Sequence, residues 1–168
     1  MNLRTAVESD LAAITRIYNA AIPGRLATAD TEVVSVESRR DWFYAHTIDR
    51  HPIWVSEQDG VVAGWLSLQP FYGRPAYRKT VEVSIYVDPS WQGQGIGKKL
   101  MRHSIESCPE LEITTLLGFI FGHNQPSLNL FHRFGFEPWG HLPQIAELDR
   151  AERDLVILGR RIKPQLNQ

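Results

Sequence analysis

Hydrophobic and polar residues alternate along some stretches of the chain and follow a helical period along others. Asn2 to Ala6 alternates as a short strand does, and the apolar residues from Leu11 to Ala21 recur at the spacing of one helix face. Ser9 is a residue type that caps helices, so we place the start of this helix beside it. A second helix is predicted from about Val36 to His46. The chain therefore opens with a strand and two helices.

Three strands are predicted in the middle of the chain. Ile53 to Glu57 and Val61 to Leu68 are separated by Gln58-Asp59-Gly60, whose Asp-Gly pair is a strong hairpin signal. Thr80 to Val87 alternates valine and isoleucine with glutamate, serine and tyrosine, which is the clearest strand pattern in the sequence. This strand therefore has one apolar face and one polar face.

The remaining segments alternate between helix and strand patterns after a glycine-rich loop. We expect a helix from Gly97 to Cys108, a strand from Thr114 to Ile120, a helix from Pro126 to Phe134 that Gly135 ends, and strands from Phe136 to His141 and Asp154 to Leu158. The element order is then β-α-α-β-β-β-α-β-α-β-β. No repeat or linker divides the chain, so residues 1–168 are interpreted as a single domain.

Composition and charge exclude several classes of partner. The 168 residues are 43% hydrophobic and 22% charged, with 18 basic and 19 acidic side chains and a formal net charge of −1. This balance gives no electrostatic footprint for nucleic acid or an anionic membrane. One cysteine, Cys108, and six scattered histidines lack metal-ligand spacing. With no signal-peptide pattern and no bilayer-length apolar run, we expect a cytoplasmic protein without a metal.

The loop Gln92-Gly93-Gln94-Gly95-Ile96-Gly97 joins the clearest strand to a helix. Its alternating glycines leave backbone N–H groups unobstructed at the positive end of a helix dipole, which is a site for phosphate. A plain strand-to-helix turn is the alternative, since glycine-rich loops are common. The spacing differs from that of the nucleoside-triphosphate loop and of the dinucleotide fingerprint. The loop therefore indicates a phosphate-bearing ligand of another kind.

Two motifs resemble the GNAT superfamily of N-acetyltransferases. Gln92 to Gly97 matches the family's Q/R-x-x-G-x-G/A motif, and the family's downstream N-x-x-S/A pattern with its helix and G-F pair is similar to Asn124, Ser127, Leu130 and Gly135-Phe136. From about Leu3 to Ile162 the chain also resembles the phosphinothricin acetyltransferase-like branch, whose marks include Phe71 to Tyr77 and Thr80 to Val87. The resemblance implies an α+β GNAT fold, with a mixed and strongly bent central sheet of about six to seven strands flanked by about four helices.

The resemblance also implies acetyl-CoA as co-substrate. Main-chain N–H groups of the strand would hold the thioester and the pantetheine arm, and the loop would hold the pyrophosphate. The residues implied in cofactor binding are Ile85, Tyr86, Val87, Gln92, Gly93, Gln94, Gly95, Ile96, Gly97, Lys98, Asn124 and Ser127. Asn124 and Ser127 have an alternative role at the start of a helix, where Asn124 can act as the cap.

Glu82 is the candidate general base, because the matching glutamate of the family accepts the proton of the substrate amine or binds that amine. A solvated glutamate is a weak base, so burial has to raise its pKa, and the alternative is a solvated strand carboxylate. Alignment of the two substrates can supply about 7–11 kcal/mol, so we expect positioning to dominate. The base is expected to be a secondary contribution.

Substrate binding is predicted for the loop before this strand, at Tyr72, Gly73, Arg74 and Pro75, together with Glu82. Arg74 could pair in a bidentate way with a substrate carboxylate, and the alternative is an ordinary surface arginine. Thr28 and Asp30 resemble the opposite wall of the family's substrate cleft.

Phe131 departs from the family pattern, in which a tyrosine or histidine protonates the leaving thiolate. Phenylalanine cannot donate a proton, and His132 is turned roughly 100° away on the helix. His123 is an outside candidate for this role. Water can also serve, since a thiol with a pKa near 8.5 leaves passably as the thiolate.

The resemblance implies a homodimeric N-acetyltransferase that moves the acetyl group of acetyl-CoA directly to the amine of a small amino acid or analogue. Phosphinothricin, methionine sulfoximine and methionine sulfone are the analogues that the family resemblance implies. Cys108 lies on the apolar stripe of the loop's helix and is interpreted as a core residue rather than a nucleophile. Two alternatives stay open, namely acetylation of a protein or peptide amine and a non-catalytic acetyl-CoA sensor.

Overall fold

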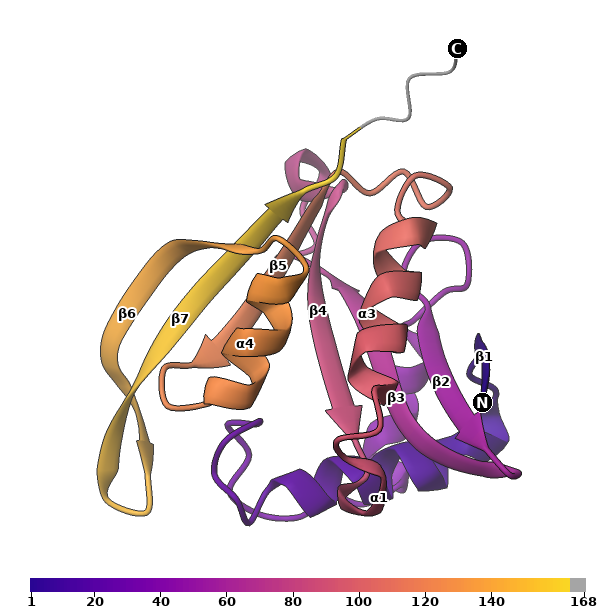
Figure 1. Ribbon diagram of the computed structural model, residues 1–168, viewed down its shortest axis with the longest axis horizontal. Coiled ribbons are helices and arrows are strands. Elements are labelled where there is room, and N and C mark those ends of the chain that lie inside the picture. The colour runs from indigo at the N-terminus through magenta and orange to yellow at the C-terminus, as the bar shows by residue number, and fades with distance from the viewer. Residues whose placement is uncertain (164–168) are drawn as a thin grey trace.

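A seven-stranded mixed sheet is the centre of the computed structural model, which describes residues 1–163 (Figure 1). The strands lie in the order β1-β2-β3-β4-β5-β7-β6, and only β4 and β5 run parallel to each other. The α-helices of the described chain number four, and none of them is both long and apolar enough to span a membrane. In chain order the elements are β1 (Asn2–Thr5), η1 (Glu8–Asp10), α1 (Leu11–Ala21), η2 (Glu37–Arg39), α2 (Arg40–Tyr44), β2 (Ile53–Gln58), β3 (Val61–Pro70), η3 (Pro75–Tyr77), β4 (Thr80–Val87), η4 (Pro89–Trp91), α3 (Ile96–Ser107), β5 (Thr115–Phe121), α4 (Gln125–Arg133), β6 (Glu137–Leu148) and β7 (Ala151–Arg161).

The predicted element order is confirmed, as is a mixed sheet of about seven strands with about four helices. The prediction that Ser9 caps the first helix is wrong. Ser9 is exposed within the short 3-10 turn η1, and the carboxylate of Asp10 accepts the N–H of Val7 at 2.8 Å instead. The chain thus enters α1 through a turn that Asp10 closes.

Two predicted elements differ in length from those observed. The predicted helix Val36–His46 consists of the 3-10 turn η2 and a five-residue α2, and Trp42 and Phe43 pack this short segment on the core. The last two strands extend to Leu148 and Arg161. Most of β6 is exposed and two register shifts interrupt it, so its sequence lacks the alternation that marks a half-buried strand.

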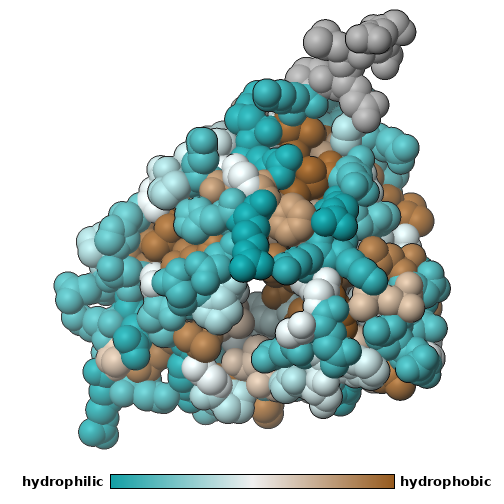
Figure 2. Space-filling view, in the orientation of Figure 1, coloured by the Kyte–Doolittle hydropathy of each residue, from teal (hydrophilic) through white to brown (hydrophobic). Residues whose placement is uncertain are grey.

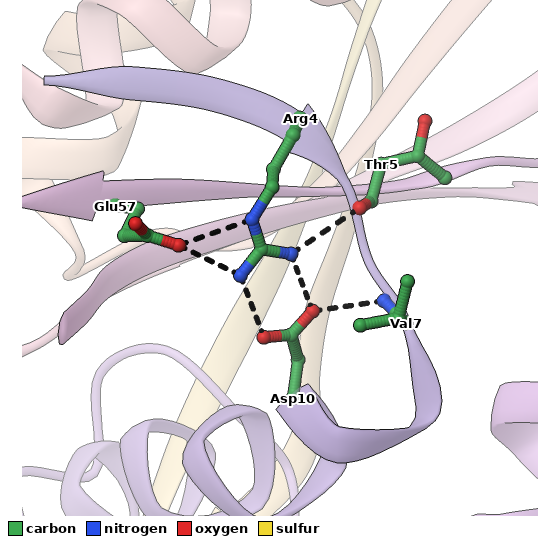
Figure 3. Close-up of polar contacts among 5 residues, drawn as sticks. All are labelled: Arg4, Thr5, Val7, Asp10 and Glu57. Atoms are coloured by element: carbon green, nitrogen blue, oxygen red, sulfur yellow. Dashed lines mark hydrogen bonds and ion pairs between the residues drawn. The ribbon is translucent and has the colours of Figure 1, made fainter. Parts of the chain in front are cut away.

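Arg4 ties the first strand to the start of α1 and to the neighbouring strand β2 (Figure 3). Its guanidinium donates in a bidentate way to Asp10, with Nη1–Oδ2 2.7 Å and Nη2–Oδ1 2.9 Å, and Nη2 lies 2.8 Å from Oε2 of Glu57. The planar guanidinium fork suits such paired carboxylates. This network sets the position of α1 relative to the edge of the sheet.

The hydrophobic core has one part on each face of the sheet. Leu100 and Met101 of α3 and Phe131 of α4 belong to the part on one face, and these two helices lie in front of the sheet in Figure 1. Ile14 and Ile17 of α1 belong to the part on the opposite face. The helices therefore cover both faces of the sheet.

Strands β4 and β5 separate after three paired positions. Thr80, Val81 and Glu82 lie beside Thr115, Leu116 and Leu117, and no strand of the described chain pairs with β4 on this side beyond Glu82. Figure 1 shows the two strands diverging toward the lower edge of the view, with α3 beside β4 and α4 beside β5. From Val83 to Val87, β4 is therefore separated from β5. This split between the two strands positions the candidate site.

Candidate active site

Two cavities meet at the split between β4 and β5. The loop cavity, of about 690 Å³, lies between the glycine-rich loop, the start of α3 and α4, and the sheet cavity, of about 640 Å³, lies on the α1 side of the sheet. Figure 2 shows a hollow on the face of the molecule where β4 and α4 diverge in Figure 1. The residues shared by both cavities are Leu26, Ala27, Ile85, Tyr86, Asn124 and Ser127. A molecule in the loop cavity can therefore reach the sheet cavity.

The glycine-rich loop presents bare backbone to the loop cavity. Gly93 and Gly95 have φ angles of 76° and 81°, and a Cβ at either position would meet open space within 4 Å. Gly95 adopts the left-handed conformation directly before Ile96, the first residue of α3. The first N–H groups of this helix therefore face the loop with no side chain over them, which is suited to bind phosphate oxygens.

Most of the residues predicted to bind a cofactor line the loop cavity. They are Ile85, Tyr86, Val87, Gln92, Gly93, Gly95, Ile96, Gly97, Lys98, Asn124 and Ser127, whereas Gln94 is exposed and lies outside this lining. Arg133, at the end of α4, also lines the cavity, although it is not among the residues predicted to bind the cofactor. Its position in the last turn of the helix after the Asn124 motif is the signal that could have found it. Lys98 and Arg133 give the cavity two positive side chains.

Asn124 forms the cap of α4, as its alternative interpretation predicted. Its Oδ1 accepts the N–H of Ser127 at 3.2 Å, and its Nδ2 donates to the carbonyl of Leu26 at 3.1 Å. The side chain is 5% exposed and lies between the two cavities. It therefore joins the segment after α1 to the start of α4, and its binding of a pantetheine amide stays a prediction.

The free edge of β4 lies along the junction of the cavities. Ile85, Tyr86 and Val87 pair with β3 on one side, and on the other they face the split. Backbone N–H groups at such an edge are available to an oxygen atom of a bound molecule. The N–H of Asp88 donates to the Ala63 carbonyl of β3, so by the two-residue period of the strand the N–H of Tyr86 also points to β3. The geometry therefore leaves main-chain donors toward the split at Ile85 and Val87, and the prediction of a free Tyr86 N–H is wrong.

The floor of the sheet cavity is formed by alternate residues of β3 and β4. Directly opposed pairs across the two strands contribute one aromatic pair and two polar pairs, which are Trp65–Tyr86, Ser67–Ser84 and Gln69–Glu82. The Trp65 and Tyr86 rings stack with centroids 4.8 Å apart. Residues two apart on a strand share one face, so the six side chains form a continuous surface. This surface is apolar at one end and carries a carboxylate at the other.

Glu82 is partly buried within this floor, and burial raises the pKa of its carboxyl group. Its carboxylate has no hydrogen-bond partner among residues 1–163, so it is available to a molecule in the cavity. A carboxylate that holds a proton more strongly than an exposed glutamate is a better general base near neutral pH. The structure thus supplies the environment that the predicted base requires.

The wall of the sheet cavity includes residues that the sequence analysis did not assign. Arg39 and Trp42 come from η2 and α2, and Tyr18 comes from α1. The hydroxyl group of Tyr18 bonds to Thr28 Oγ1 at 2.6 Å and donates to Asp30, so the predicted wall residues Thr28 and Asp30 are held here. The Arg-x-x-Trp spacing places Arg39 and Trp42 on one side of a helical turn and was the available signal.

The predicted substrate loop lies apart from both cavities. Tyr72, Gly73, Arg74 and Pro75 are exposed between β3 and β4, and none of them belongs to either lining. Phe71 stacks on Phe119 of β5, which lines the sheet cavity, at a centroid distance of 6.4 Å. The loop is therefore adjacent to the cavity without entering it, and its substrate contacts stay a prediction.

The residues considered for proton donation to a thiolate lie as follows. Phe131 is 2% exposed and lines the sheet cavity with its ring against Gly118. His132 has Nδ1 at 3.2 Å from the carbonyl of Phe136, and His123 has Nε2 at 2.7 Å from the carbonyl of Arg25. Neither histidine lines either cavity. Neither histidine is therefore placed by these linings to protonate a thiolate, and protonation by water stays a prediction.

Cys108 is buried in the core, as predicted. It is 0% exposed, its Sγ lies 3.1 Å from the carbonyl of Ser104, and burial raises the pKa of the thiol to about 12. A thiol in this state is neither ionised at neutral pH nor accessible to a substrate. The structure is thus consistent with transfer that needs no cysteine intermediate.

A glycine-rich loop suited to phosphate and a partly buried carboxylate line two cavities that meet at the split sheet. This arrangement fits a group-transfer enzyme with a phosphate-bearing donor and a small acceptor. The chain belongs to the GNAT family of acetyltransferases, because the family model described as "Acetyltransferase (GNAT) family" matches residues 12–136. The family predicted from the two motifs is therefore confirmed. The enzyme is an acetyltransferase of this family.

Relatives of the chain carry names that indicate related chemistry. The chain is 50% identical over 163 residues to "Putative phosphinothricin acetyltransferase YwnH" of Bacillus subtilis (strain 168), covering 96% of this chain and 99% of that protein. It is 34% identical to the L-methionine sulfoximine/L-methionine sulfone acetyltransferase of Salmonella typhimurium, covering 86% and 85%. A crystal structure of a phosphinothricin acetyltransferase from Sinorhizobium meliloti in complex with acetyl-CoA superposes with a TM-score of 0.91 at 29% identity, covering 99% and 91%.

Proposed function

We propose that this enzyme transfers the acetyl group of acetyl-CoA to the amine of a small amino acid or amino-acid analogue in the cytoplasm. The names of the relatives support this acceptor class, with phosphinothricin, methionine sulfoximine and methionine sulfone as the specific analogues. The sheet cavity, at about 640 Å³, has room for such a molecule. The loop cavity is lined by glycines without side chains and by the positive side chains of Lys98 and Arg133, which suits the phosphates of acetyl-CoA.

The observation that carries the proposal is the junction of the two cavities at the free edge of β4. Ile85 and Tyr86 line both cavities, and Glu82 lies on the same strand within the sheet cavity. A thioester that enters from the loop cavity therefore meets an acceptor amine beside a buried carboxylate. This arrangement aligns the two substrates, which is the larger part of the rate enhancement expected for such a reaction.

Each part of the site has a defined role in this proposal. Glu82 accepts the proton of the acceptor amine, directly or through one water molecule. The amine nitrogen then forms a bond to the thioester carbonyl carbon as the carbon–sulfur bond breaks. Backbone N–H groups of Ile85 and Val87 stabilise negative charge on the carbonyl oxygen. Because Phe131 carries no proton, water protonates the departing thiolate.

A thiol-release assay with acetyl-CoA and a panel of acceptors tests the proposal. The panel contains free amino acids, phosphinothricin, methionine sulfoximine and methionine sulfone, with short peptides carrying free amino groups as the comparison. Thiol release confined to the free amino acids and their analogues is the expected result. Release with peptides alone would replace the proposal by protein acetylation, and binding of acetyl-CoA without turnover of any amine would indicate a sensor.

We infer that the enzyme is a homodimer, and β6 supports this inference. It is an edge strand whose Trp139, Leu142 and Ile145 side chains are 46%, 40% and 57% exposed. Unpaired strand edges with apolar side chains are frequent sites of association between chains. The mass in solution, measured by light scattering, should be twice the 19.2 kDa of one chain, and a mass of one chain at micromolar concentration would contradict the inference.

A further inference from the structure

Arg39 places a positive charge on the wall of the sheet cavity without an opposite charge to pair it. The lining of the sheet cavity includes no lysine and no second arginine. Arg39 forms no ion pair within residues 1–163. Its Nε is buried and has no hydrogen-bond partner within the same residues. Arg39 therefore has unused donor groups beside the space where an acceptor would bind.

Aromatic rings hold the guanidinium in place. Its Cζ lies 3.9 Å from the centroid of Trp42 and 4.5 Å from that of Tyr18. Trp42 in turn lies 5.5 Å from Trp65, which is part of the cavity floor. Stacking on ring faces orients the plane of a guanidinium and leaves the N–H groups at its edge free for an anion. The two rings thus position the guanidinium of Arg39, while its Nε has no hydrogen-bond partner within residues 1–163.

A half-buried charge without a partner carries a desolvation cost. Burial lowers the pKa of Arg39, although Tyr18, Tyr86 and Asp30 oppose this effect. Asp30 forms no ion pair with Arg39 within residues 1–163, and its carboxylate accepts a hydrogen bond from the Tyr18 hydroxyl group. Uncompensated charges of this kind destabilise a fold and persist mainly where function needs them. An anionic group of a bound molecule would offset this cost.

A second unsatisfied group in the same cavity points to a polar ligand. The Oγ of Ser67 is buried, has no hydrogen-bond partner among the described residues, and belongs to a residue that is 0% exposed. Ser67 lies on the floor between the Trp65 and Gln69 positions and lines the cavity. A buried hydroxyl group without a partner is unusual in a folded protein. Its placement indicates that the molecule which fills the cavity brings hydrogen-bonding groups of its own.

We propose that Arg39 binds the carboxylate of the acceptor amino acid and so acts as a specificity-determining residue of the acceptor site. The inference rests on the proposed function and names the contact that distinguishes an amino acid from a simple amine. The two N–H groups along one edge of the guanidinium match the two oxygens of a carboxylate. Arg39 and Glu82 then form two opposed poles of the cavity, one for the carboxylate and one for the amine.

Arg74 is the competing anchor, because the sequence motif around it predicts the same role. Arg74 is exposed in the loop before β4 and lies outside the lining of the sheet cavity. An exposed arginine is satisfied by water and gains less from a carboxylate than one that is already desolvated. The position of Arg39 within the lining therefore favours it over Arg74.

The test compares an amino acid that the enzyme acetylates with its primary carboxamide, in which the carboxylate is replaced by a neutral group. Arg39→Gln should raise KM for the amino acid by about 10- to 100-fold, which is the loss expected for a charge-assisted hydrogen bond. The KM for the carboxamide should change less than threefold. Arg39→Lys should give an intermediate increase, since it keeps the charge and loses the planar fork.

Arg40→Gln is the matched control, because Arg40 is the next residue and pairs with Glu8 and Glu37. It should leave both KM values unchanged. Equal increases of KM for the amino acid and the carboxamide with Arg39→Gln would overturn the inference by assigning Arg39 a packing role. A selective increase with Arg74→Gln and not with Arg39→Gln would transfer the anchor to Arg74.

Two further measurements keep the outcomes separate. Circular dichroism of Arg39→Gln shows whether the variant folds, and if it does not, the Arg39→Lys comparison decides between the same outcomes. The unaltered enzyme is assayed first with both acceptors. If it acetylates no amino acid, the proposed function fails and the inference with it, whereas an active enzyme without the selective loss overturns the inference alone.

Discussion

Glu82 has a carboxylate that is partly withdrawn from water and free of protein partners, so its ionisation should control the acid side of the rate profile. Burial raises its pKa above the ordinary glutamate value, and the carboxyl group therefore takes up a proton at a higher pH than an exposed one would. The protonated form cannot accept a proton from the acceptor amine. We predict that kcat falls as pH falls through this raised pKa.

Replacement of Glu82 by Gln tests this role. Glu82→Gln should lower kcat at pH 7.5 by at least tenfold, since a positioned base contributes a factor of about 10² or more, and it should remove the acid limb. Glu110→Gln, at an exposed position away from both cavities, should leave the profile unchanged. The measurement is kcat between pH 5.5 and 9. An acid limb that persists in Glu82→Gln would assign it to another group.

The same substitution should have the opposite effect on stability. A carboxyl group whose folded pKa is raised contributes stability that is present below the unfolded pKa, near 4.3, and is lost as pH rises through the folded pKa. A neutral glutamine does not lose this contribution. Glu82→Gln should therefore melt at a higher temperature than the unaltered enzyme at pH 7.5 and at a similar temperature below pH 4. A lower melting temperature at pH 7.5 would contradict the burial argument.

Site residues whose proposed roles depend on the local backbone can be predicted from the sequence. Site residues that depend on contacts with side chains distant in the sequence cannot. Gly93 and Gly95 were identified because a loop, a strand and a helix follow one another locally. Arg39 lies 43 positions before Glu82, and it is held at the cavity by the rings of Trp42 and Tyr18, with Trp42 packed edge-to-face on Trp65. Contacts between rings of separate elements have no local sequence signal. The anion anchor was therefore assigned to Arg74, the arginine beside the strand.

At the scale of elements, we expect the backbone conformation of the glycine-rich loop to control binding of acetyl-CoA. Its effect on KM can be distinguished from an effect on the free energy of unfolding. Gly95→Ala places a Cβ at φ 81° in a position that faces the loop cavity. The left-handed conformation costs an alanine about 1 kcal/mol, and the methyl group would project into the space that we propose for the phosphates of acetyl-CoA. We predict that KM for acetyl-CoA rises at least fivefold while kcat changes less than twofold.

Gly60→Ala is the matched control for this prediction. Gly60 has φ 79°, a Cβ added there would meet open space, and the residue lies in the β2–β3 turn away from both cavities. The two variants should lose similar free energy of unfolding in urea. Only Gly95→Ala should raise KM for acetyl-CoA, and an equal increase in both would show that the effect comes from destabilisation.

The contact between α4 and β5 depends on a glycine for a different reason. A Cβ on Gly118 would lie 2.4 Å from Cε1 of Phe131, so the ring and the strand would have to move apart. Overpacking of this kind costs about 1–3 kcal/mol. Gly118→Ala should lower the free energy of unfolding in urea by this amount. Gly122→Ala, where the nearest atom is the Asp154 Cβ at 3.4 Å, should cost less than about 1 kcal/mol, as ordinary van der Waals contact requires.

The predictability of the strands follows their burial. The bounds of β4 were predicted in full from Thr80 to Val87, because its faces differ in polarity and the residues alternate accordingly. β6 was predicted only as far as His141, since most of its residues are exposed and register shifts follow Pro138 and Leu142. A strand without a buried face has no reason to alternate. The order of elements was therefore accessible, whereas the length of the last hairpin was not.

At the scale of the whole molecule, we expect binding of the donor substrate at the split sheet to increase the free energy of unfolding of the enzyme. The strands β1 to β4 and the strands β5 to β7 are joined by only three backbone register positions between β4 and β5 in the described chain. α4 and the start of α3 both line the loop cavity, and they meet where Leu130 Cδ2 lies 3.4 Å from the position that a Cβ on Gly97 would take. A molecule in this cavity contacts both halves of the sheet. Binding should therefore stabilise the entire fold rather than the loop alone.

This argument predicts a thermal shift with a stated size. At 100 times its Kd, acetyl-CoA should add about 2.7 kcal/mol to the free energy of unfolding. For a chain of this length each kcal/mol raises Tm by about 2–4 °C, so Tm should rise by roughly 5–10 °C in scanning calorimetry. Hydrogen exchange should slow at Ile85 and Val87, because their N–H groups face the split and gain the bound molecule as a partner. A shift in Tm without added protection at this edge would place acetyl-CoA outside the split, whereas protection there with a single cooperative transition would show that the substrate completes the sheet.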